Sequence, residues 1–234
     1  SHQLRTPLSA INWYSEMLLN GDAGKVNEEQ ASYLKEIYEG NKRMVELVDS
    51  LLNVSRLEVG KLKNEPVDTS MTEIADSLEK ELAVSIKAHK IDYARDVEAK
   101  LPTVYADPKL LRIILQNLLS NAVKYTPDTG KVRLTMRRAT SSDTQNAKLP
   151  RGDYLLLSVS DTGYGIPEAQ RGKIFEKLFR ADNVRKLDVE GTGLGLYIVQ
   201  EIIKIFGGHI WFDTKEGHGT TFHVIIPVKT KPSS

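Results

Sequence analysis

The stretch from Asp161 to Gly195 decides how the larger part of this chain is interpreted. It contains D-T-G-Y-G-I-P (161–167), I-F-E-K-L-F-R (174–180) and, after a charged run, G-T-G-L-G-L (191–196). An aspartate beside a glycine turn presents a carboxylate to the edge of a base, and a glycine-rich helix start offers free backbone N–H groups to phosphates. Together these segments predict a nucleotide pocket.

Three other interpretations of these residues fail. A Rossmann fingerprint needs a glycine where Leu196 stands and a strand before the glycines, and no P-loop sequence G-x-x-x-x-G-K-[ST] occurs. D-T-G appears twice, at Asp128 and Asp161, as in aspartic proteases. Those enzymes are all-β and carry the two loops on separate lobes, whereas Asp128 directly follows a predicted helix. By itself, the G-x-G-x-G of 191–195 therefore identifies no class of nucleotide site.

Composition and charge limit what accompanies the pocket. The 234 residues suffice for two small domains, and 40% hydrophobic residues supply at least one sizeable core. The formal net charge of +1, from 32 basic and 31 acidic residues, gives no electrostatic reason to expect nucleic acid or a membrane surface as a partner. No cysteine occurs, which excludes disulfides and thiolate metal sites and suits a reducing compartment.

The sequence also bears on location. No apolar run approaches the roughly 18 residues of a membrane-spanning helix, and no signal peptide is present. We therefore expect a cytoplasmic chain without membrane contact of its own. Because it begins at Ser1 and His2 instead of Met, we also expect a fragment, and any membrane anchor of the full-length protein would lie upstream.

Residues 1–62 predict an antiparallel helical hairpin. Apolar residues recur at helical spacing in both halves, and the sequence G-D-A-G-K-V between them breaks the pattern. Asn27 and Gln30 fit a capping box at the start of the second helix, and Gly60 fits its end. Two helices bury little by themselves, so we expect a homodimer that forms a four-helix bundle. Packing of the hairpin on the rest of its own chain is the alternative.

Residues 63–70 lose helical periodicity and contain Pro66, which predicts a hinge. The remainder, 71–234, predicts an α/β sandwich in which helices cover one sheet, so that the whole chain has an α+β fold class. We expect the polar segment 139–153 to be a mobile loop and the charged run 180–190 to be a mobile lid. The predicted helices cover 71–88, 108–126, 167–179 and 194–206, and the predicted strands cover 90–98, 131–138, 154–160, 209–213 and 220–228.

The predicted helix 108–126 carries two different faces. One is an apolar stripe that we expect to be buried. On another, spacings of three and four residues bring together Asn117, Asn121, Lys124 and Tyr125. These side chains offer amide oxygens for a hard cation, an ammonium group for phosphate and an aromatic ring beside a base.

Five motifs follow one another along the chain: S-H-Q-L-R-T-P-L (1–8), N-L-L-S-N-A-V-K-Y (117–125), D-T-G-Y-G-I-P, I-F-E-K-L-F-R and G-T-G-L-G-L-Y-I-V (191–199). In order and spacing they resemble the H, N, G1, F and G2 boxes of the sensor histidine kinases of two-component systems. The resemblance covers nearly the whole chain. It implies a dimerisation and histidine-phosphotransfer domain over 1–62, followed after the hinge by a catalytic ATP-binding domain of the Bergerat type over 71–234.

The resemblance also implies a role for individual residues. His2 would be the phosphoacceptor, since a largely neutral imidazole keeps a lone pair for attack on the γ-phosphate of ATP. Asn121 would bind Mg²⁺, with Asn117 beside it, and Asp161 would accept the adenine amino group. The other ATP-binding positions would be phosphate contacts from Lys124 and Arg180, a base contact from Tyr125, close backbone approach at Gly163 and Gly165, and a phosphate-side wall of Gly191, Thr192, Gly193, Leu194 and Gly195.

One position departs from the family pattern. The residue after the phosphoacceptor is usually Glu or Asp, acting as a base, and here it is Gln3. An amide holds the tautomer of the imidazole but takes no proton, so we expect slow autophosphorylation, a missing base costing about 10²- to 10⁴-fold. Thr6 matches the position that orients water when the family dephosphorylates its partner, and would serve a phosphatase activity.

The sequence therefore predicts an ATP- and Mg²⁺-dependent protein-histidine kinase core. It would phosphorylate His2 and pass the phosphate to an aspartate on the receiver domain of a response regulator. The alternative from another class is a dimeric scaffold that binds nucleotide without transferring phosphate. Gln3 favours the scaffold, whereas Asn121, Asp161 and the three glycines of 191–195 favour the kinase.

Overall fold

The computed structural model describes residues 2–58, 64–185 and 191–228. The chain divides into two compact units, Ser1–Leu62 and Lys63–Ser234. The predicted helix stop at Gly60 and residues 186–190 of the predicted lid lie outside the described residues.

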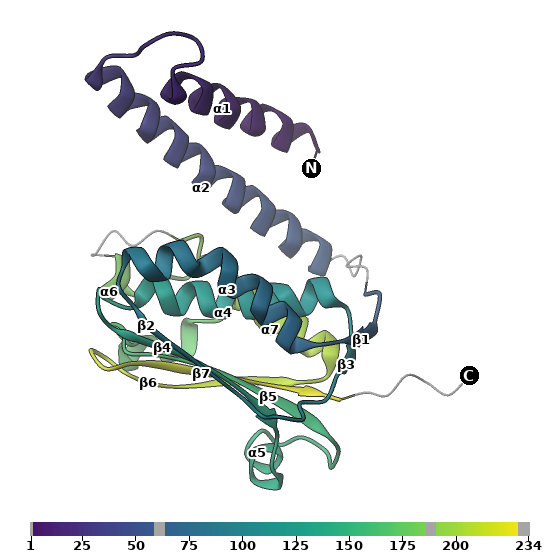
Figure 1. The fold of residues 1–234 in the computed structure, drawn as a ribbon. Coiled ribbons are helices and arrows are strands. Elements are labelled where there is room, and N and C mark those ends of the chain that lie inside the picture. Colours follow the sequence, from purple (N-terminus) through teal and green to yellow (C-terminus); the bar gives the residue numbers. More distant parts are fainter. Residues whose placement is uncertain (1, 59–63, 186–190, 229–234) are drawn as a thin grey trace. The chain divides into compact units, whose positions relative to one another are not determined.

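The smaller unit is a hairpin of α1 (His2–Asn20) and α2 (Glu28–Glu58) (Figure 1). The predicted capping box is confirmed: the Gln30 N–H donates to Asn27 Oδ1 at 2.8 Å, and the Asn27 N–H donates to Gln30 Oε1 at 3.0 Å. Leu8 of α1 and Asn41 of α2 are both buried. The side-chain amide of Asn41 donates to the backbone carbonyl of Leu8 at 2.7 Å. Many other apolar side chains of the hairpin are exposed, among them Ile11, Trp13, Tyr14, Ile37, Met44 and Leu51.

The larger unit contains a five-stranded sheet in the order β2-β4-β5-β7-β6. β2 and β4 are parallel, and the other neighbours are antiparallel. Helices α3, α4 and α7 cover one face of the sheet (Figure 1), which confirms the α/β sandwich and the α+β fold class. The strands are β2 (Asp92–Val97), β4 (Lys131–Arg138), β5 (Tyr154–Asp161), β6 (His209–Lys215) and β7 (Gly219–Pro227); the helices are α3 (Met71–Ala88), α4 (Pro108–Tyr125) and α7 (Gly195–Phe206).

The helix α4 lies at the centre of this unit. Asp107 caps it by accepting a hydrogen bond from the Lys109 N–H at 2.8 Å, and Pro108 occupies its first turn. α4 contacts both β5 and α7, and its burial fixes the position of its polar face relative to them. The predicted apolar stripe is at most 4% exposed, at Leu111, Ile114, Leu118 and Ala122.

Residues 67–69 of the predicted hinge form a short strand instead. β1 (Val67–Thr69) pairs antiparallel with β3 (Val104–Ala106), a strand that the sequence did not predict. Thr69 is buried, and its hydroxyl donates to the Ala106 carbonyl at 3.0 Å. Three residues are too few to show a strand's alternation, and the pairing partner is distant in sequence, so the pattern carries no signal for this pair.

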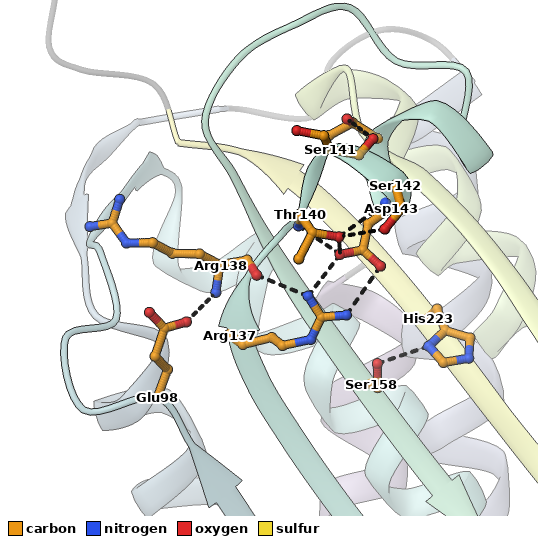
Figure 2. Close-up of polar contacts among 10 residues, drawn as sticks. Glu98, Arg137, Arg138, Thr140, Ser141, Ser142, Asp143, Ser158 and His223 are labelled. Atoms are coloured by element: carbon orange, nitrogen blue, oxygen red, sulfur yellow. Dashed lines mark hydrogen bonds and ion pairs between the residues drawn. The ribbon is translucent and has the colours of Figure 1, made fainter.

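The prediction of a loop over 139–153 is wrong for its middle, which forms the helix α5 (Ser141–Asn146). A capping box begins this helix: the Asp143 N–H donates to Thr140 Oγ1, and the Thr140 N–H donates to Asp143 Oδ2 at 2.6 Å (Figure 2). Arg137 donates to both oxygens of the same carboxylate, at 2.7 and 3.1 Å, and holds the pKa of Asp143 below its ordinary value. A polar segment is therefore ordered by polar partners.

The predicted helix over 167–179 is also wrong in part. Only the 3₁₀ helix η1 (Glu168–Lys173) forms, after which the chain turns with Leu178 at a φ of 60°. Leu178 is 62% exposed, whereas Phe175 packs edge-on against Phe212. Tertiary contacts override the local helical preference here, because the Leu178 backbone lies against Gly193. A short helix, α6 (Asp182–Arg185), follows in the predicted lid.

Candidate nucleotide-binding site

Asp161 ends β5 with a partly buried carboxylate. Its Oδ1 accepts hydrogen bonds from the backbone N–H groups of Gly163, at 2.8 Å, and Thr220, at 3.2 Å. Among the described residues, none donates to the second oxygen, Oδ2. Burial raises the pKa of Asp161 to about 6, although the two backbone hydrogen bonds oppose the shift. One carboxylate oxygen is thus occupied by the fold, and the other is available to a ligand.

The turn that follows Asp161, residues 163–166, is called the base-reading turn after the role that the sequence predicts for it. The Tyr164 N–H donates to the Tyr125 carbonyl at the end of α4, at 3.2 Å. A Cβ at Gly163 would run into that same carbonyl, and a Cβ at Gly165, whose φ is 61°, would run into the Lys215 carbonyl. Both positions therefore require glycine, because the backbone passes too close to its neighbours for a side chain.

The predicted polar face of α4 lies beside this turn. Asn117 is oriented by its own helix, since its Nδ2 donates to the Ile113 carbonyl at 2.8 Å. The Lys124 ammonium lies 5.5 Å from the centroid of the Tyr125 ring. Burial raises the pKa of Tyr125, and the positive charge of nearby Arg180 opposes that shift, so Arg180 is close to this face. Asn121 lies one turn beyond Asn117 and is partly buried.

The glycine run before α7 lies against the same face of α4. A Cβ at Gly191 would come within 2.9 Å of Lys124 Nζ, and a Cβ at Gly195 would run into Asn117 Oδ1. Gly193 has a φ of 69°, where a Cβ would lie 2.7 Å from the Leu178 carbonyl carbon. The run therefore passes close to α4 at Gly191 and Gly195, as a phosphate-side wall would.

The residues between these glycines fix the start of α7. Leu194 is buried, and its N–H donates to Thr192 Oγ1 at 3.3 Å. The Ile198 N–H donates to the Leu194 carbonyl at 3.0 Å, which begins the helix. Thr192 and Leu194 thus hold the glycines in place.

The predicted ATP-binding residues are therefore brought together around the C-terminal half of α4. The predicted catalytic residues belong to the smaller unit: His2 begins α1, and Gln3 and Thr6 are exposed positions of the same helix. Sequence reasoning missed Thr220, which donates its N–H to Asp161. Since that contact comes from the backbone, the side-chain pattern held no signal for it.

Within the described ranges, no helix is long and apolar enough to cross a membrane.

Comparison with known proteins covers both units. The family model of the histidine kinase-, DNA gyrase B-, and HSP90-like ATPase matches residues 106–230, and that of the His Kinase A (phospho-acceptor) domain matches residues 1–60. A solved structure of full-length ShkA in complex with AMPPNP superposes with a TM-score of 0.74 at 28% identity, over 99% of this chain and 45% of that chain.

Two curated relatives are also named as kinases. The circadian input-output histidine kinase CikA of Synechococcus elongatus is 35% identical over 98% of this chain and 29% of its own length. The adaptive-response sensory kinase SasA of Synechococcus sp. (strain JA-3-3Ab) is 32% identical over 97% of this chain and 57% of its own length. The chain thus spans 29% to 57% of these two relatives. With the phospho-acceptor domain and the ATPase domain in this order, the chain belongs to the sensor histidine kinases, of which it contains the catalytic core.

Proposed function

We propose that this chain binds ATP at the polar face of α4, transfers the γ-phosphoryl group to His2, and passes it on to an aspartate of a response-regulator receiver domain. One observation carries the proposal: two motifs far apart in sequence converge on this face. The base-reading turn contacts the Tyr125 carbonyl, and the glycine run lies against Lys124 and Asn117. The carboxylate that would bind the base and the glycine run that would bind the phosphates therefore both lie along α4. A single bound nucleotide requires this arrangement.

Asp161 would select the base. Its Oδ1 is held by two backbone N–H groups, so Oδ2 would accept the hydrogen bond of an exocyclic amino group, which adenine presents. Lys124 and Arg180, both close to Tyr125, would compensate the charge of the phosphates. The AMPPNP bound in the ShkA structure supports an adenine nucleotide as the ligand.

The residues present fit a Mg²⁺ ion held together with the nucleotide. Asn121 would be the protein ligand of the ion, with Asn117 beside it. The amide oxygen of Asn117 faces Gly195. Mg²⁺ typically takes one or two protein ligands and completes its shell with water and phosphate oxygens. An all-protein cage is not offered, because the described residues contain no group of three or more His, Cys, Asp or Glu suited to a metal. When bound, the ion would neutralise charge on the β- and γ-phosphates.

His2 would attack as a neutral imidazole at the start of α1. Gln3 would hold the imidazole without accepting its proton, which makes the transfer slow. Thr6, one turn further along α1, would orient water for removal of phosphate from the partner.

The hairpin would form a homodimer. The hairpin exposes apolar side chains, among them Ile11, Ile37, Met44 and Leu51, and their contact with water is unfavourable. A second hairpin would bury them in a four-helix bundle. ATP and a receiver domain as partners would place the chain in the cytoplasm.

The test is incorporation of phosphate from γ-labelled ATP with Mg²⁺, comparing the chain with its His2→Ala variant. Phosphohistidine is acid-labile and base-stable, so we expect label that disappears in acid and is absent from the variant. ATP binding without any label would support the other candidate, a nucleotide-binding scaffold, which Gln3 favours. Label that persists in His2→Ala would contradict His2 as the acceptor.

A further inference from the structure

The base-reading turn is held by three elements of the larger unit. α4 holds it through the Tyr125 carbonyl. The β6–β7 hairpin holds it through the Gly217 N–H, which donates to the Tyr164 carbonyl at 2.8 Å, and through Thr214 Oγ1, which accepts from the Ile166 N–H at 3.0 Å. The third element is α6, which follows Arg180 in the chain and contacts the turn through the side chain of Asn183.

Both the nitrogen and the oxygen of the Asn183 side-chain amide form hydrogen bonds. Its Nδ2 donates to the Gly165 carbonyl at 3.0 Å and to the Tyr164 carbonyl at 3.4 Å, and its Oδ1 accepts from the Val184 N–H at 3.0 Å. Val184 is buried, so α6 is anchored in the core at this point. The neighbouring oxygens and N–H fix which way the amide points. An aspartate of the same shape would set a carboxylate oxygen against two carbonyl oxygens.

A second contact of α6 does not involve the turn. The Asp182 N–H donates to Gln170 Oε1 at 3.0 Å, and the Gln170 amide donates back to the Asp182 carboxylate. This pair ties α6 to η1 with the same kind of groups that Asn183 uses. It therefore provides a matched control for the effect of loosening α6 alone.

We propose that Asn183 is a positioning residue for nucleotide binding, which fixes the carbonyls of the base-reading turn from α6 and so keeps Asp161 aligned on the base. The inference rests on the proposed function, because it concerns the same ATP site. Asn183 acts through the turn, which lies beside the base and not beside the γ-phosphate. The affinities for ADP and for ATP should therefore depend on Asn183 equally.

The test is the isosteric change Asn183→Asp in the whole chain, with dissociation constants measured for ADP and for ATP. We expect both to rise about tenfold, the effect of about 1.4 kcal/mol. The phosphorylation rate at saturating ATP should stay within about twofold of the wild type, since the defect lies in binding. Gln170→Glu, which breaks the other tie of α6, should leave both dissociation constants within about twofold. Should Asn183→Asp fail to fold, Asn183→Ala removes the donors without adding charge and has the same expected result.

Three results would overturn the inference: unchanged affinities in the Asn183 variants, an equal loss in Gln170→Glu, or a loss confined to ATP. The third would place the effect at the γ-phosphate. Absence of ATP binding in the wild type would overturn the proposed function and this inference with it, and the wild-type titration separates that case from the others.

Discussion

Asp161→Asn should make the nucleotide-free protein more stable while weakening its affinity for ATP at least about a hundredfold. The variant keeps an acceptor at the position of Oδ1, so the hydrogen bonds from Gly163 and Thr220 persist. It removes the buried negative charge. It also replaces Oδ2 by an amide donor, which would face the amino group of adenine donor against donor.

The size of the stabilisation follows from the pKa of Asp161. Burial raises that pKa from 3.8 to about 6. The difference corresponds to a free-energy cost of about 3 kcal/mol for keeping the side chain ionised in the folded protein. Because the folded protein holds this proton more tightly than the unfolded chain, stability falls as the pH rises from about 4 to about 6, and the full cost applies above about pH 6. The amide of the variant carries no charge and is free of this cost, so we expect the variant to gain up to about 3 kcal/mol at pH 7.5 and almost nothing at pH 4.

Urea unfolding without nucleotide measures the gain. The chain has 2 tryptophans, Trp13 and Trp211, so a Trp13→Phe background leaves Trp211 of β6 as the reporter of the sheet. The same samples titrated with ATP should bind at least about a hundredfold more weakly, since a buried donor is left without an acceptor. A variant less stable than the wild type at pH 7.5, or equally stabilised at pH 4 and pH 7.5, would refute the assignment of the cost to a buried charge.

Other predictions concern the turn, the phosphotransfer step and α5. Gly163→Ala places a Cβ against a backbone carbonyl of α4 and should abolish ATP binding and lower the free energy of unfolding by about 1–3 kcal/mol, whereas Gly172→Ala, with nothing within 4 Å of its Cβ, should change neither in the same titrations. Gln3→Glu supplies the missing base and should raise the initial rate of autophosphorylation by about 10²-fold or more; an unchanged rate would show that Gln3 is not limiting. Arg137→Met should let the pKa of Asp143 return toward its ordinary value, visible in an NMR titration of that carboxyl, while autophosphorylation stays within about twofold; a lost activity would contradict a purely structural role for α5.

The polar face of α4 could be predicted because helical periodicity alone determines which residues share a face. Once Pro108 and the apolar stripe identify the helix, Asn117, Lys124 and Tyr125 follow from spacing. Gly163 and Gly195 could be singled out for a related reason, since only glycine permits such close backbone approach.

What escaped prediction depends on contacts between distant segments. Thr220 reaches Asp161 through its backbone, which any residue type would allow. Asn183 meets the base-reading turn only after the chain has folded, and its amide resembles any surface asparagine in the sequence. Leu178 has the spacing of a helical core residue, yet the approach of Gly193 places it in a turn with its side chain exposed. Local pattern therefore locates the site, whereas tertiary contacts set its fine geometry.

We propose that the nucleotide site at α4 delivers phosphate to His2. The most direct measurement is mass-spectrometric mapping of the phosphorylated residue after incubation with ATP and Mg²⁺, performed under basic conditions on the wild type and on Asp161→Asn. We expect phosphate on His2 in the wild type and none in the variant. Phosphate on another residue, or phosphorylation of His2 that survives the loss of Asp161, would contradict it.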